Sequence, residues 1–554
     1  MKKIISFVLM FVMIGCLFTG CIDYTDSEKT LTEEETKQEL NALMKNVKVT
    51  SVSDPVLDIY SDDVQEADAL ADISVYPLVV NGNGAINIEV AADTEMSSEA
   101  PDDWMIIIAN KFNKENHTYN DKKITISVRQ ITGGEVVTYM RANAYKPDLY
   151  VPSHAGWGKM LDASGIHTIT LCDRLLGNTA GILMSDKIYD EFISKYGEVS
   201  IKNVVEANLN GDLKFAYTNP YTSSTGLNML TIILKAFDEE NPISQKAAEK
   251  LNAYQRTSPP TAYTTAVMRN KAAKGLIDAM VMEEQAYVFT QALSKYIYVP
   301  AGIRHDHPVF TFDYVSDEKQ EAAKIFIEYC LSDESQKLGY EKGFNRHNEY
   351  VGEEPGLDGN GYLEAQSLWK QNKNGGIPTV AVFVADVSGS MNGEPLNELK
   401  RALIATAPYI NSDSYIGLIS YSDSVIKHLN IGKFDDKQRA YFSGEVKSLK
   451  AGGGTATYDA VLTAMQMIRD FGATLPEYKP MIFLLTDGQQ NQGWSLSRIL
   501  PVVKGTNIPV YSIAYNYSGN RDLETLSEKN EAVVIPAKTE DLINQLRGLF
   551  NVEG

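Results

Sequence analysis

Five short apolar segments in the last third of the chain constrain its fold more than any other feature. Helical patterns separate most of these segments. Nearly continuous apolar runs of this length are typical of parallel strands that are buried on both faces of a sheet. Parallel strands need crossover connections, so the alternation predicts one doubly wound α/β domain from residue 378 to 554. In chain order, the segments are Val380–Ala385, Tyr415–Ser420, Met481–Thr486, Ile508–Ala514 and Ala532–Ile535.

Polar residues follow two of these predicted strands, at the point where each strand ends. Asp386, Ser388 and Ser390 form a D-x-S-x-S pattern after the first strand, and Asp487 follows the third strand in T-D-G. Between them, a glycine-rich loop carries Thr455. Ligands of open α/β sheets bind beyond the carboxyl ends of the strands. Because hydroxyl and carboxylate oxygens favour hard cations, these residues predict a divalent metal site, with Mg²⁺ as the first expectation and Ca²⁺ or Mn²⁺ as alternatives.

This ordered set of motifs resembles the von Willebrand factor A (VWA) domain and its metal-ion-dependent adhesion site. The resemblance implies a Rossmann-like fold in which Ser388, Ser390 and Thr455 contact the metal through their hydroxyls. Asp386 and Asp487 would act mainly through bound waters. If the direct ligands are neutral, the ion keeps most of its charge toward solvent. A carboxylate from an extracellular protein partner can then replace one water and complete the coordination shell.

Two other interpretations of these residues stay open. The aspartates can cap strand ends without binding metal, since aspartate is a common capping residue. The serines can be hydrolase nucleophiles, but the chain has no G-x-S-x-G elbow and none of its seven histidines lies near either motif. The chain is therefore expected not to be an enzyme.

Strand-like and helix-like patterns also alternate between residues 80 and 350. Ile86–Val90 alternates with a period of two, Trp104–Phe112 has helical spacing, and Ile124–Val128 follows as another strand. This order predicts a second α/β region.

Three stretches of this region resemble bacterial extracellular solute-binding proteins of the type II periplasmic-binding kind. A helix, a break at Ser332 and a second helix resemble their C-terminal helices. Pro147–Ser153 resembles their first hinge crossing, and Ala216–Gly226 resembles the ligand loop of their second lobe. The resemblance implies two α/β lobes that close on a ligand by hinge motion.

Hydroxyl-bearing residues are the predicted ligand contacts of this cleft. Hydroxyls and free N–H groups at a helix start attract oxyanions, although such residues can simply cap the helix. No Arg or Lys is placed for a strongly charged anion, so the solute class stays open between oxyanion, sugar and small polar solute, with a vestigial cleft as the remaining alternative. The sequence His305-Asp306-His307 is interpreted as a loop or strand end and not as a metal site. The candidate residues are Ser97, Ser98, Ser153, Thr222, Ser223, Ser224 and Thr225.

The N-terminus has the pattern of a secretory signal peptide. Lys2 and Lys3 precede an uncharged stretch from Ile4 to Ile22 that contains Thr-Gly-Cys near its end. This ending resembles a bacterial lipobox, which implies a signal peptide over residues 1–20 and a lipidated, palmitate-bearing Cys21. The alternative is an uncleaved signal anchor. Both interpretations place the protein at the extracytoplasmic face of the cell membrane.

Charge and composition define the remaining segments. The chain has 51 Lys+Arg against 72 Asp+Glu, a net charge of −21, so nucleic acid is not an expected partner. Residues 21–79 are predicted to be an acidic, solvated spacer that includes a short helix from Thr32 to Met44. Residues 351–377 are rich in Gly and Asn and are predicted to be a linker.

These features together predict a membrane-anchored extracellular binding and adhesion lipoprotein. The metal site would capture a carboxylate of a protein partner, and the hinged cleft would bind a small solute. The alternative is the substrate-binding component of an ABC-type transport system, with the VWA domain as an accessory docking module.

Overall fold

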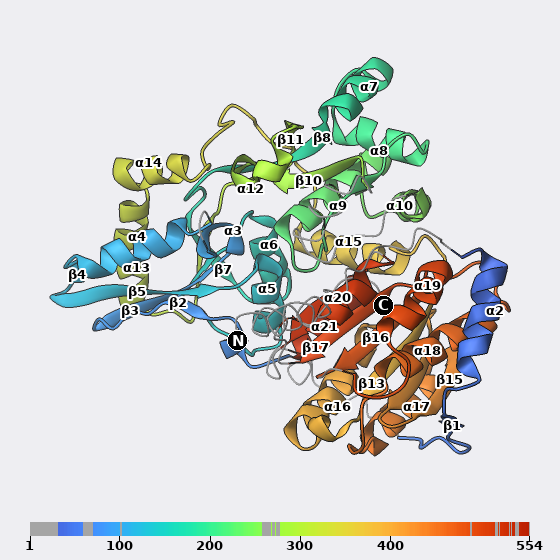
Figure 1. The fold of residues 1–554 in the computed structure, drawn as a ribbon. Coiled ribbons are helices and arrows are strands. Elements are labelled where there is room, and N and C mark those ends of the chain that lie inside the picture. Colours follow the sequence, from blue (N-terminus) through green and yellow to red (C-terminus); the bar gives the residue numbers. More distant parts are fainter. Residues whose placement is uncertain are drawn as a thin grey trace, which may run out of the picture.

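The computed structural model describes three sheets in two packed bodies (Figure 1). The predicted signal peptide and Cys21 lie outside the described residues. None of the helices in the described ranges combines the length and hydropathy that crossing a bilayer requires. The described residues are 31–58, 70–99, 102–257, 268, 272, 277–487, 490–515, 519, 521–530, 532, 534–537 and 542–552.

The C-terminal domain is built on a seven-stranded sheet of order β1-β15-β14-β13-β16-β17-β18. The central strand β13 is buried along its whole length and pairs in parallel with β14 and β16. The sequence did not predict β15 (Val425–Lys433), which runs antiparallel to β14. The five predicted strands correspond to β13 (Thr379–Asp386), β14 (Tyr415–Tyr421), β16 (Lys479–Thr486), β17 (Val510–Tyr515) and β18 (Val534–Ala537).

Helices cover both faces of this sheet, so the predicted doubly wound fold is confirmed. Alternate side chains of β13 enter two separate cores, with Phe383 on one face and Val382 on the other. The Phe383 face packs against α16 (Glu394–Thr406), α17 (Asp436–Ser448) and α21 (Leu542–Val552). The Val382 face packs against α2 (Glu33–Met44), α18 (Thr457–Gly472), α19 (Leu496–Thr506) and α20 (Arg521–Glu528).

The predicted spacer is wrong for the stretch from residue 31 to 58, which belongs to the C-terminal domain. Helix α2 starts with a capping box between Thr32 and Glu35, and it lies beside α18 and α19 (Figure 1). Its Leu40 and Leu43 are fully or almost fully buried. Strand β1 (Val49–Ser51) then pairs in parallel with β15. The helix's acidic residues occupy its exposed side, so high local charge concealed an apolar stripe that the core buries.

The other body has two lobes, each with its own sheet. The first lobe holds the order β2-β5-β3-β6-β12-β7 and the second lobe holds β11-β8-β10-β9. The chain crosses between lobes after β7 and returns before β12, so Pro147–Ser153 lies within the first lobe and is not a crossing. The first-lobe strands are β2 (Leu78–Val80), β3 (Ile86–Ala92), β4 (Thr118–Tyr119), which pairs with β5, β5 (Lys122–Gln130), β6 (Leu149–Val151), β7 (Thr168–Cys172) and β12 (Val309–Phe312). The second-lobe strands are β8 (Asn178–Ser185), β9 (Phe215–Ala216), β10 (Ala279–Glu283) and β11 (Tyr296–His305).

Helices flank the sheets of both lobes, and they include those that the sequence predicted. The break at Ser332 is confirmed, because its side chain caps the second of the two C-terminal helices. First-lobe helices are α3 (Thr94–Ser97), α4 (Trp104–Lys114), α5 (Gly133–Arg141), α6 (Gly156–Ala163), α13 (Asp317–Cys330) and α14 (Asp333–Glu341). Second-lobe helices are α7 (Asp186–Tyr196), α8 (Ile201–Leu209), α9 (Ser224–Phe237), α10 (Gln245–Thr257) and α12 (Glu284–Phe289).

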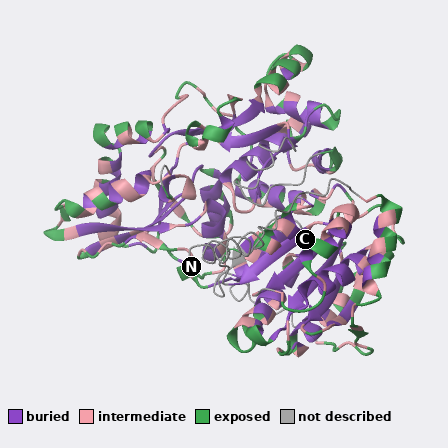
Figure 2. Ribbon diagram, in the orientation of Figure 1, coloured by how far each residue is buried: buried purple, intermediate pink, exposed green. Residues whose placement is uncertain are grey.

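The predicted linker at 351–377 is also wrong, because most of its second half is helix α15 (Gly359–Asn372). This helix packs against α6 of the first lobe and α9 and α10 of the second. Its Trp369 is fully buried, and the indole N–H donates to the Tyr217 hydroxyl at 2.9 Å. Glycine and asparagine surround the helix and mask its apolar face in the sequence. Figure 2 shows that the strands of the sheets are mostly buried, whereas exposed residues lie on the outer helices and loops.

A buried ion pair joins the two bodies. Arg547 of α21 pairs with Glu135 of α5, and the two side chains are only 3% and 10% exposed. Beside them, Asn544 donates to the Tyr139 hydroxyl at 3.0 Å. Charges this deeply buried are tolerated only when they are paired, so this contact fixes how the bodies meet.

Replacing Leu40 with Ala tests whether α2 belongs to the C-terminal core. The substitution should lower the free energy of unfolding by about 2–5 kcal/mol, because it removes a fully buried side chain. Denaturant unfolding of the full chain measures this loss. Lys37→Ala, on the exposed side of the same helix, should change stability by no more than about 0.5 kcal/mol. Equal effects of the two substitutions would mean that α2 is a solvated segment.

Replacing Arg547 with Ala should destabilise the protein by about 3–5 kcal/mol, because Glu135 would keep a buried charge without its partner. Thermal unfolding of the wild type and of each variant measures this loss of stability. Arg401→Ala removes the half-exposed partner of Glu398 and should cost no more than about 1 kcal/mol. The double variant Glu135→Leu with Arg547→Met should recover most of the loss, and a loss as large as that of Arg547→Ala would contradict the explanation.

Candidate functional site

The strand-end cluster consists of Asp386, Ser388, Ser390, Thr455 and Asp487. Asp386 is the last residue of β13 and is fully buried. Its Oδ1 accepts the Ser388 N–H at 2.8 Å, and its Oδ2 accepts the Thr486 hydroxyl at 2.8 Å and the Tyr421 hydroxyl at 3.1 Å. These bonds hold the carboxylate rigidly at the carboxyl edge of the sheet.

Side-chain hydrogen bonds connect the first loop of the cluster with the third. The Ser388 and Ser390 hydroxyl oxygens lie 3.0 Å apart, and the Ser390 hydroxyl donates to Asp487 Oδ1 at 2.9 Å. Asp487 follows β16, which neighbours β13 in the sheet. Two strand ends that are 100 residues apart in the sequence are therefore within one hydrogen-bonded chain.

Backbone hydrogen bonds bring the glycine loop with Thr455 to the same place. The Gly389 N–H donates to the Gly453 carbonyl at 3.0 Å, and the Gly452 N–H donates to the Val387 carbonyl at 2.8 Å. Gly453 has φ +87°, and a Cβ there would lie 2.3 Å from an oxygen of Asp423. This close approach explains the need for glycine.

Two residues that the sequence did not single out support the glycine loop. Asp423 Oδ1 accepts the Gly454 N–H at 2.8 Å, and Asn491 Oδ1 accepts the Thr455 N–H at 2.9 Å. Both lie outside the recognised motifs, in loops after β14 and β16, so spacing alone did not point to them. The structure brings all five predicted residues to one edge of the sheet.

The electrostatics of the cluster suit a hard cation. Burial raises the pKa of Asp487, and the negative charge of Asp386 adds to that effect, while the Ser390 hydroxyl opposes it. A divalent ion between the two carboxylates would offset their repulsion. The donors are all oxygens, the set that Mg²⁺, Mn²⁺ and Ca²⁺ prefer, so the residues fit the expected ion.

A cavity of about 290 Å³ lies between the two lobes. Of the seven residues predicted to contact a solute, Ser98, Thr222, Ser223 and Ser224 line it. Ser223 also caps α9, with its hydroxyl oxygen accepting the Gly226 N–H at 3.2 Å, so the capping alternative is correct for this residue.

The other three predicted contacts do not line this cavity. The Ser97 hydroxyl donates to the carbonyls of Ala92 and Asp93 at 3.0 and 2.9 Å, within its own lobe. Ser153 and Thr225 are buried, with exposed fractions of 0% and 2%. Small hydroxyl side chains occur in cores as well as in clefts, and the sequence pattern did not separate the two settings.

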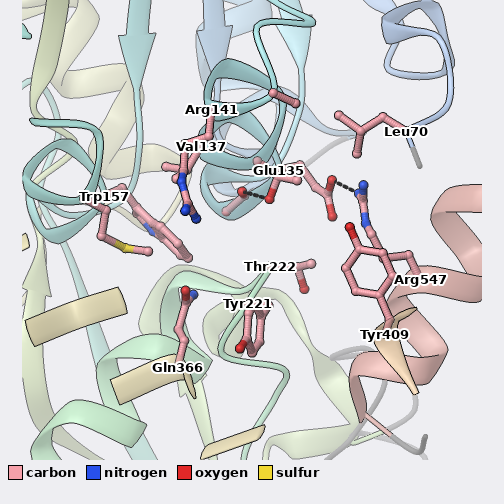
Figure 3. A pocket seen from close by; sticks show the side chains of 14 residues that line it. Leu70, Glu135, Val137, Arg141, Trp157, Tyr221, Thr222, Gln366, Tyr409 and Arg547 are labelled. Atoms are coloured by element: carbon pink, nitrogen blue, oxygen red, sulfur yellow. Dashed lines mark hydrogen bonds and ion pairs between the residues drawn. The ribbon is translucent and has the colours of Figure 1, made fainter. Parts of the chain in front are cut away.

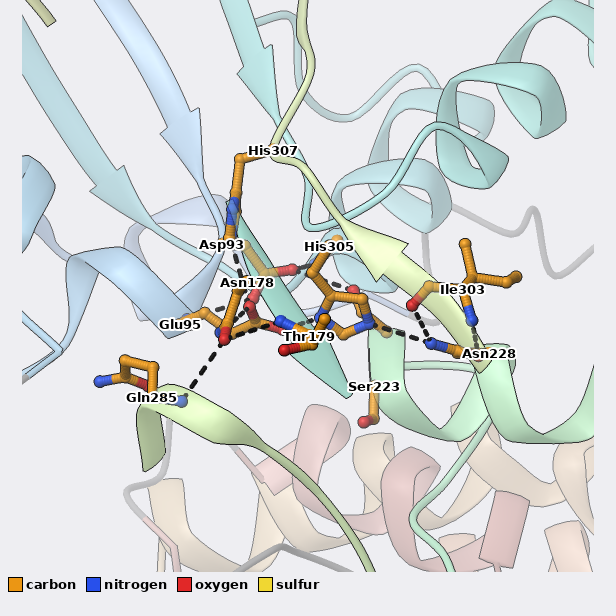
Figure 4. Close-up of polar contacts among 12 residues, drawn as sticks. Asp93, Glu95, Asn178, Thr179, Ser223, Asn228, Gln285, Ile303, His305 and His307 are labelled. Carbon is orange, nitrogen blue, oxygen red and sulfur yellow. Dashed lines mark hydrogen bonds and ion pairs between the residues drawn. The ribbon is translucent and has the colours of Figure 1, made fainter. Parts of the chain in front are cut away.

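The walls of the cavity are acidic, which the sequence analysis missed. Asp93, Glu95, Asp102 and Glu283 line it, and the described lining residues include no Lys or Arg. Asp93 caps helix α3 after β3 and Glu95 lies in that helix, whereas Glu283 ends β10 in the second lobe. The Glu95 carboxylate contacts His305 Nδ1 at 2.7 Å and His307 Nε2 at 3.1 Å (Figure 4).

Hydrogen bonds cross the cavity from one lobe to the other. Ser224 donates to Asp93 Oδ2 at 3.3 Å and accepts the Trp157 indole N–H at 2.9 Å. Gln285 of the second lobe donates to Asp102 of the first. The lobes are therefore in contact around the cavity, as in a closed arrangement.

A second cavity, of about 200 Å³, lies where the two bodies meet (Figure 3). Helix α5 of the first lobe supplies Glu135 and Arg141, and the C-terminal domain supplies Tyr409 and Arg547. Thr222 lines both this cavity and the interlobe cavity. One loop of the second lobe thus touches both spaces.

A Ser–His–Glu arrangement occurs in the interior of the C-terminal domain. The Ser420 hydroxyl lies 2.8 Å from His428 Nε2, and His428 Nδ1 lies 2.7 Å from Glu445 Oε2. All three residues are buried, and none lines the cavities described above. Glu445 also accepts the Val56 N–H at 2.6 Å, so this network attaches the N-terminal segment to the domain.

The fold and these sites define a protein of two binding modules. The model of the bacterial extracellular solute-binding protein family matches residues 94–345, and that of the von Willebrand factor type A domain matches residues 381–548. The chain therefore combines a solute-binding region with a C-terminal VWA domain. Modules of both kinds are typically non-catalytic, which supports a binding or adhesion role, and the extracellular solute-binding region suggests an extracytoplasmic location.

Curated relatives match this chain over a small part of their own length. A von Willebrand factor A domain-containing protein of Dictyostelium discoideum is 31% identical over 117 residues, which cover 21% of this chain and 14% of that protein. Inter-alpha-trypsin inhibitor heavy chain H3 of Mus musculus is 29% identical over 187 residues, which cover 31% of this chain and 21% of that protein. The chain thus spans about a fifth or less of the length of these relatives.

Solved structures resemble each module separately. The sulfate-binding protein SubI of Mycobacterium tuberculosis has a TM-score of 0.34 and 13% identity, covering 52% of this chain and 91% of that chain. A von Willebrand factor type A structure from Catenulispora acidiphila has a TM-score of 0.29 and 17% identity, covering 32% of this chain and 42% of that chain.

Proposed function

We propose that this protein is a lipid-anchored, extracytoplasmic binding and adhesion protein with two recognition sites. The strand-end cluster holds a divalent cation, Mg²⁺ first among them, which captures a carboxylate of an extracellular protein partner. The interlobe cavity binds a small solute. Cys21 is the proposed lipid attachment site that keeps the protein at the cell membrane.

The observation that carries the metal site is the convergence of three loops on one hydrogen-bonded set of oxygens. Ser390 donates to Asp487, Asp386 holds the backbone of Ser388, and the Thr455 loop bonds to the backbone of Gly389. Hydroxyls contribute no negative charge, so an ion that they ligate directly stays attractive to an outside carboxylate. Mg²⁺ exchanges only a few of its ligands for protein groups, which leaves positions for water and for the partner.

Transport is the second candidate function, and the closed interlobe cavity favours it. In that case the protein delivers a solute to an ABC-type permease, and the VWA domain serves as a docking module. Deleting the gene would then abolish uptake of the solute. Under the adhesion proposal, deletion would remove partner binding and leave uptake unchanged.

Isothermal titration of the full chain with Mg²⁺ tests the metal site. The wild type should bind one ion, and Asp386→Ala or Thr455→Ala should remove the binding heat. Asp436→Ala is the matched control, because it removes an exposed carboxylate in the first turn of α17, outside the cluster. Indistinguishable titrations for the wild type and both cluster variants would refute the metal site, provided that thermal unfolding shows all variants folded.

A further inference from the structure

The interlobe cavity combines a concentration of carboxylates with an absence of Lys and Arg among its described lining residues. This inference rests on the proposed solute-binding role of the cavity. The cavity and its position between the lobes define the site, and the charges on its walls define the class of solute.

Glu95 does not supply the charge that a solute would meet, because protein donors already surround it. The Asn228 amide is fixed by the backbone of Ile303, since it donates to the Ile303 carbonyl at 2.7 Å and accepts the Ile303 N–H at 2.8 Å. Its NH₂ group therefore faces His305 Nε2, at 3.3 Å. The ring proton must then be on His305 Nδ1, which donates to Glu95.

His307 is the second histidine against Glu95. Its Nδ1 lies 2.7 Å from the Leu176 carbonyl and must donate to it, so the Nε2 that faces Glu95 at 3.1 Å carries a proton only when the ring is an imidazolium. Burial raises the pKa of Glu95, but the two histidines outweigh this effect and hold the pKa well below its ordinary value. Glu95 is therefore an ionised carboxylate whose charge is balanced inside the protein.

Unlike Glu95, the carboxylates of Asp93 and Glu283 have no hydrogen bond to a histidine among the described residues. Among the described residues, no Lys or Arg forms an ion pair with either of them. Asp93 accepts hydrogen bonds only from neutral donors, namely the N–H groups of Glu95 and Gly133 at 3.3 and 3.0 Å and the hydroxyls of Thr94 and Ser224 at 3.4 and 3.3 Å. No described side chain donates a hydrogen bond to Glu283. Burial, followed by the charge of Glu95, raises the pKa of Glu283 to about 8 and also raises the pKa of Asp93.

We propose that the interlobe cavity takes a small organic cation that carries an ammonium group, held by Glu283 and Asp93 from opposite lobes. An ammonium group offers three donors, and the lining adds hydroxyl acceptors from Thr132, Thr222 and Ser223. The oxygen of Thr132 is shielded from solvent and has no hydrogen-bond partner among the described residues. A bound cation offsets the cost of burying two carboxylates, which a neutral sugar cannot do and an oxyanion would increase.

The protonation of His305 argues against a metal ion as the solute. Ligand atoms of Glu95, Glu283 and His305 lie within 4.8 Å of one another, which is close enough to surround an ion. A histidine nitrogen must be free of its proton to bind a metal, however, and the Asn228 amide keeps the proton on the nitrogen that faces this group.

Titration of the full chain at neutral pH tests the assignment. The ammonium probes are putrescine, ethanolamine and choline, and the comparison probes are glucose, sulfate, molybdate, Zn²⁺ and Mn²⁺. The two metals are titrated into Asp386→Ala, so that the strand-end cluster does not contribute. At least one ammonium probe should bind by calorimetry and raise the melting temperature, and none of the comparison probes should do so.

Glu283→Gln should weaken ammonium binding by about 10-fold or more, because it removes a charged hydrogen-bond acceptor. Glu284→Gln is the matched control, since the neighbouring carboxyl contacts Thr179 and His347 and does not line the cavity. Equal affinity of Glu283→Gln and wild type for the ammonium probe would overturn the assignment. So would binding of a metal alone, or binding of no ammonium probe.

The outcomes separate this inference from the proposed function. Binding of glucose or an oxyanion in place of an ammonium probe would refute the cation and preserve solute binding. Failure of every probe would count against both. The Mg²⁺ titration of the strand-end cluster tests the metal site, and its result does not depend on whether the interlobe cavity binds any of these probes.

Discussion

A carboxylate buried at the end of a central strand is the constraint on which the C-terminal domain depends. Asp386 ends a strand that is covered on both faces, so its charge must be met by donors within the protein. Those donors come from Thr486 at the end of β16, Tyr421 at the end of β14, and the backbone of its own loop. The same contacts that make the buried charge tolerable also hold the loop after β13 beside the end of β16, and backbone bonds from that loop bring the glycine loop to the same place. Stability and the candidate metal site therefore share one physical origin.

In the interlobe cavity, the carboxylates belong to two lobes and not to the end of one strand. These carboxylates meet only when the lobes approach each other, as the bond between Ser224 and Asp93 requires. Glu95 is compensated by two histidines behind it, whereas the charge at Asp93 and Glu283 faces the cavity. Closure thus concentrates negative charge in a small volume. Occupancy and closure are linked through that charge.

Much of the fold was predictable because parallel strands that are buried on both faces leave a simple pattern. The five apolar segments correspond to five strands, and the aspartate at the end of β13 was placed correctly. Strand β15 escaped notice because it is not a continuous apolar run: only Val425, His428 and Leu429 are buried, and polar residues such as Lys427 and Lys433 lie between and after them. The short helix α2 was predicted, but its polar composition placed it in a solvated spacer, and α15 was taken for a linker, although one face of each helix enters a core.

The candidate sites were predictable to different degrees for the same physical reason. Motifs at strand ends are local in sequence, so the strand-end cluster followed from the pattern of each loop. The acidic cavity depends on Glu95 and Glu283, which are far apart in sequence and meet only through the packing of two lobes. No local pattern distinguishes these glutamates from surface ones. Ser153 and Thr225 were predicted to contact a solute, but both are buried in the interior, and a local sequence pattern does not distinguish buried hydroxyl residues from those that line a cavity.

The pairing of β1 with β15 determines which part of the protein first bears a pulling force. The chain reaches the VWA domain first, through α2 and β1, then forms both lobes, and then returns to the VWA domain. Tension applied at the N-terminal side therefore loads the VWA domain before it can reach the hinge between the lobes. A pulling force would be carried by a three-residue parallel ladder and by the apolar contacts of Leu40 and Leu43, while the lobes stay free to open and close.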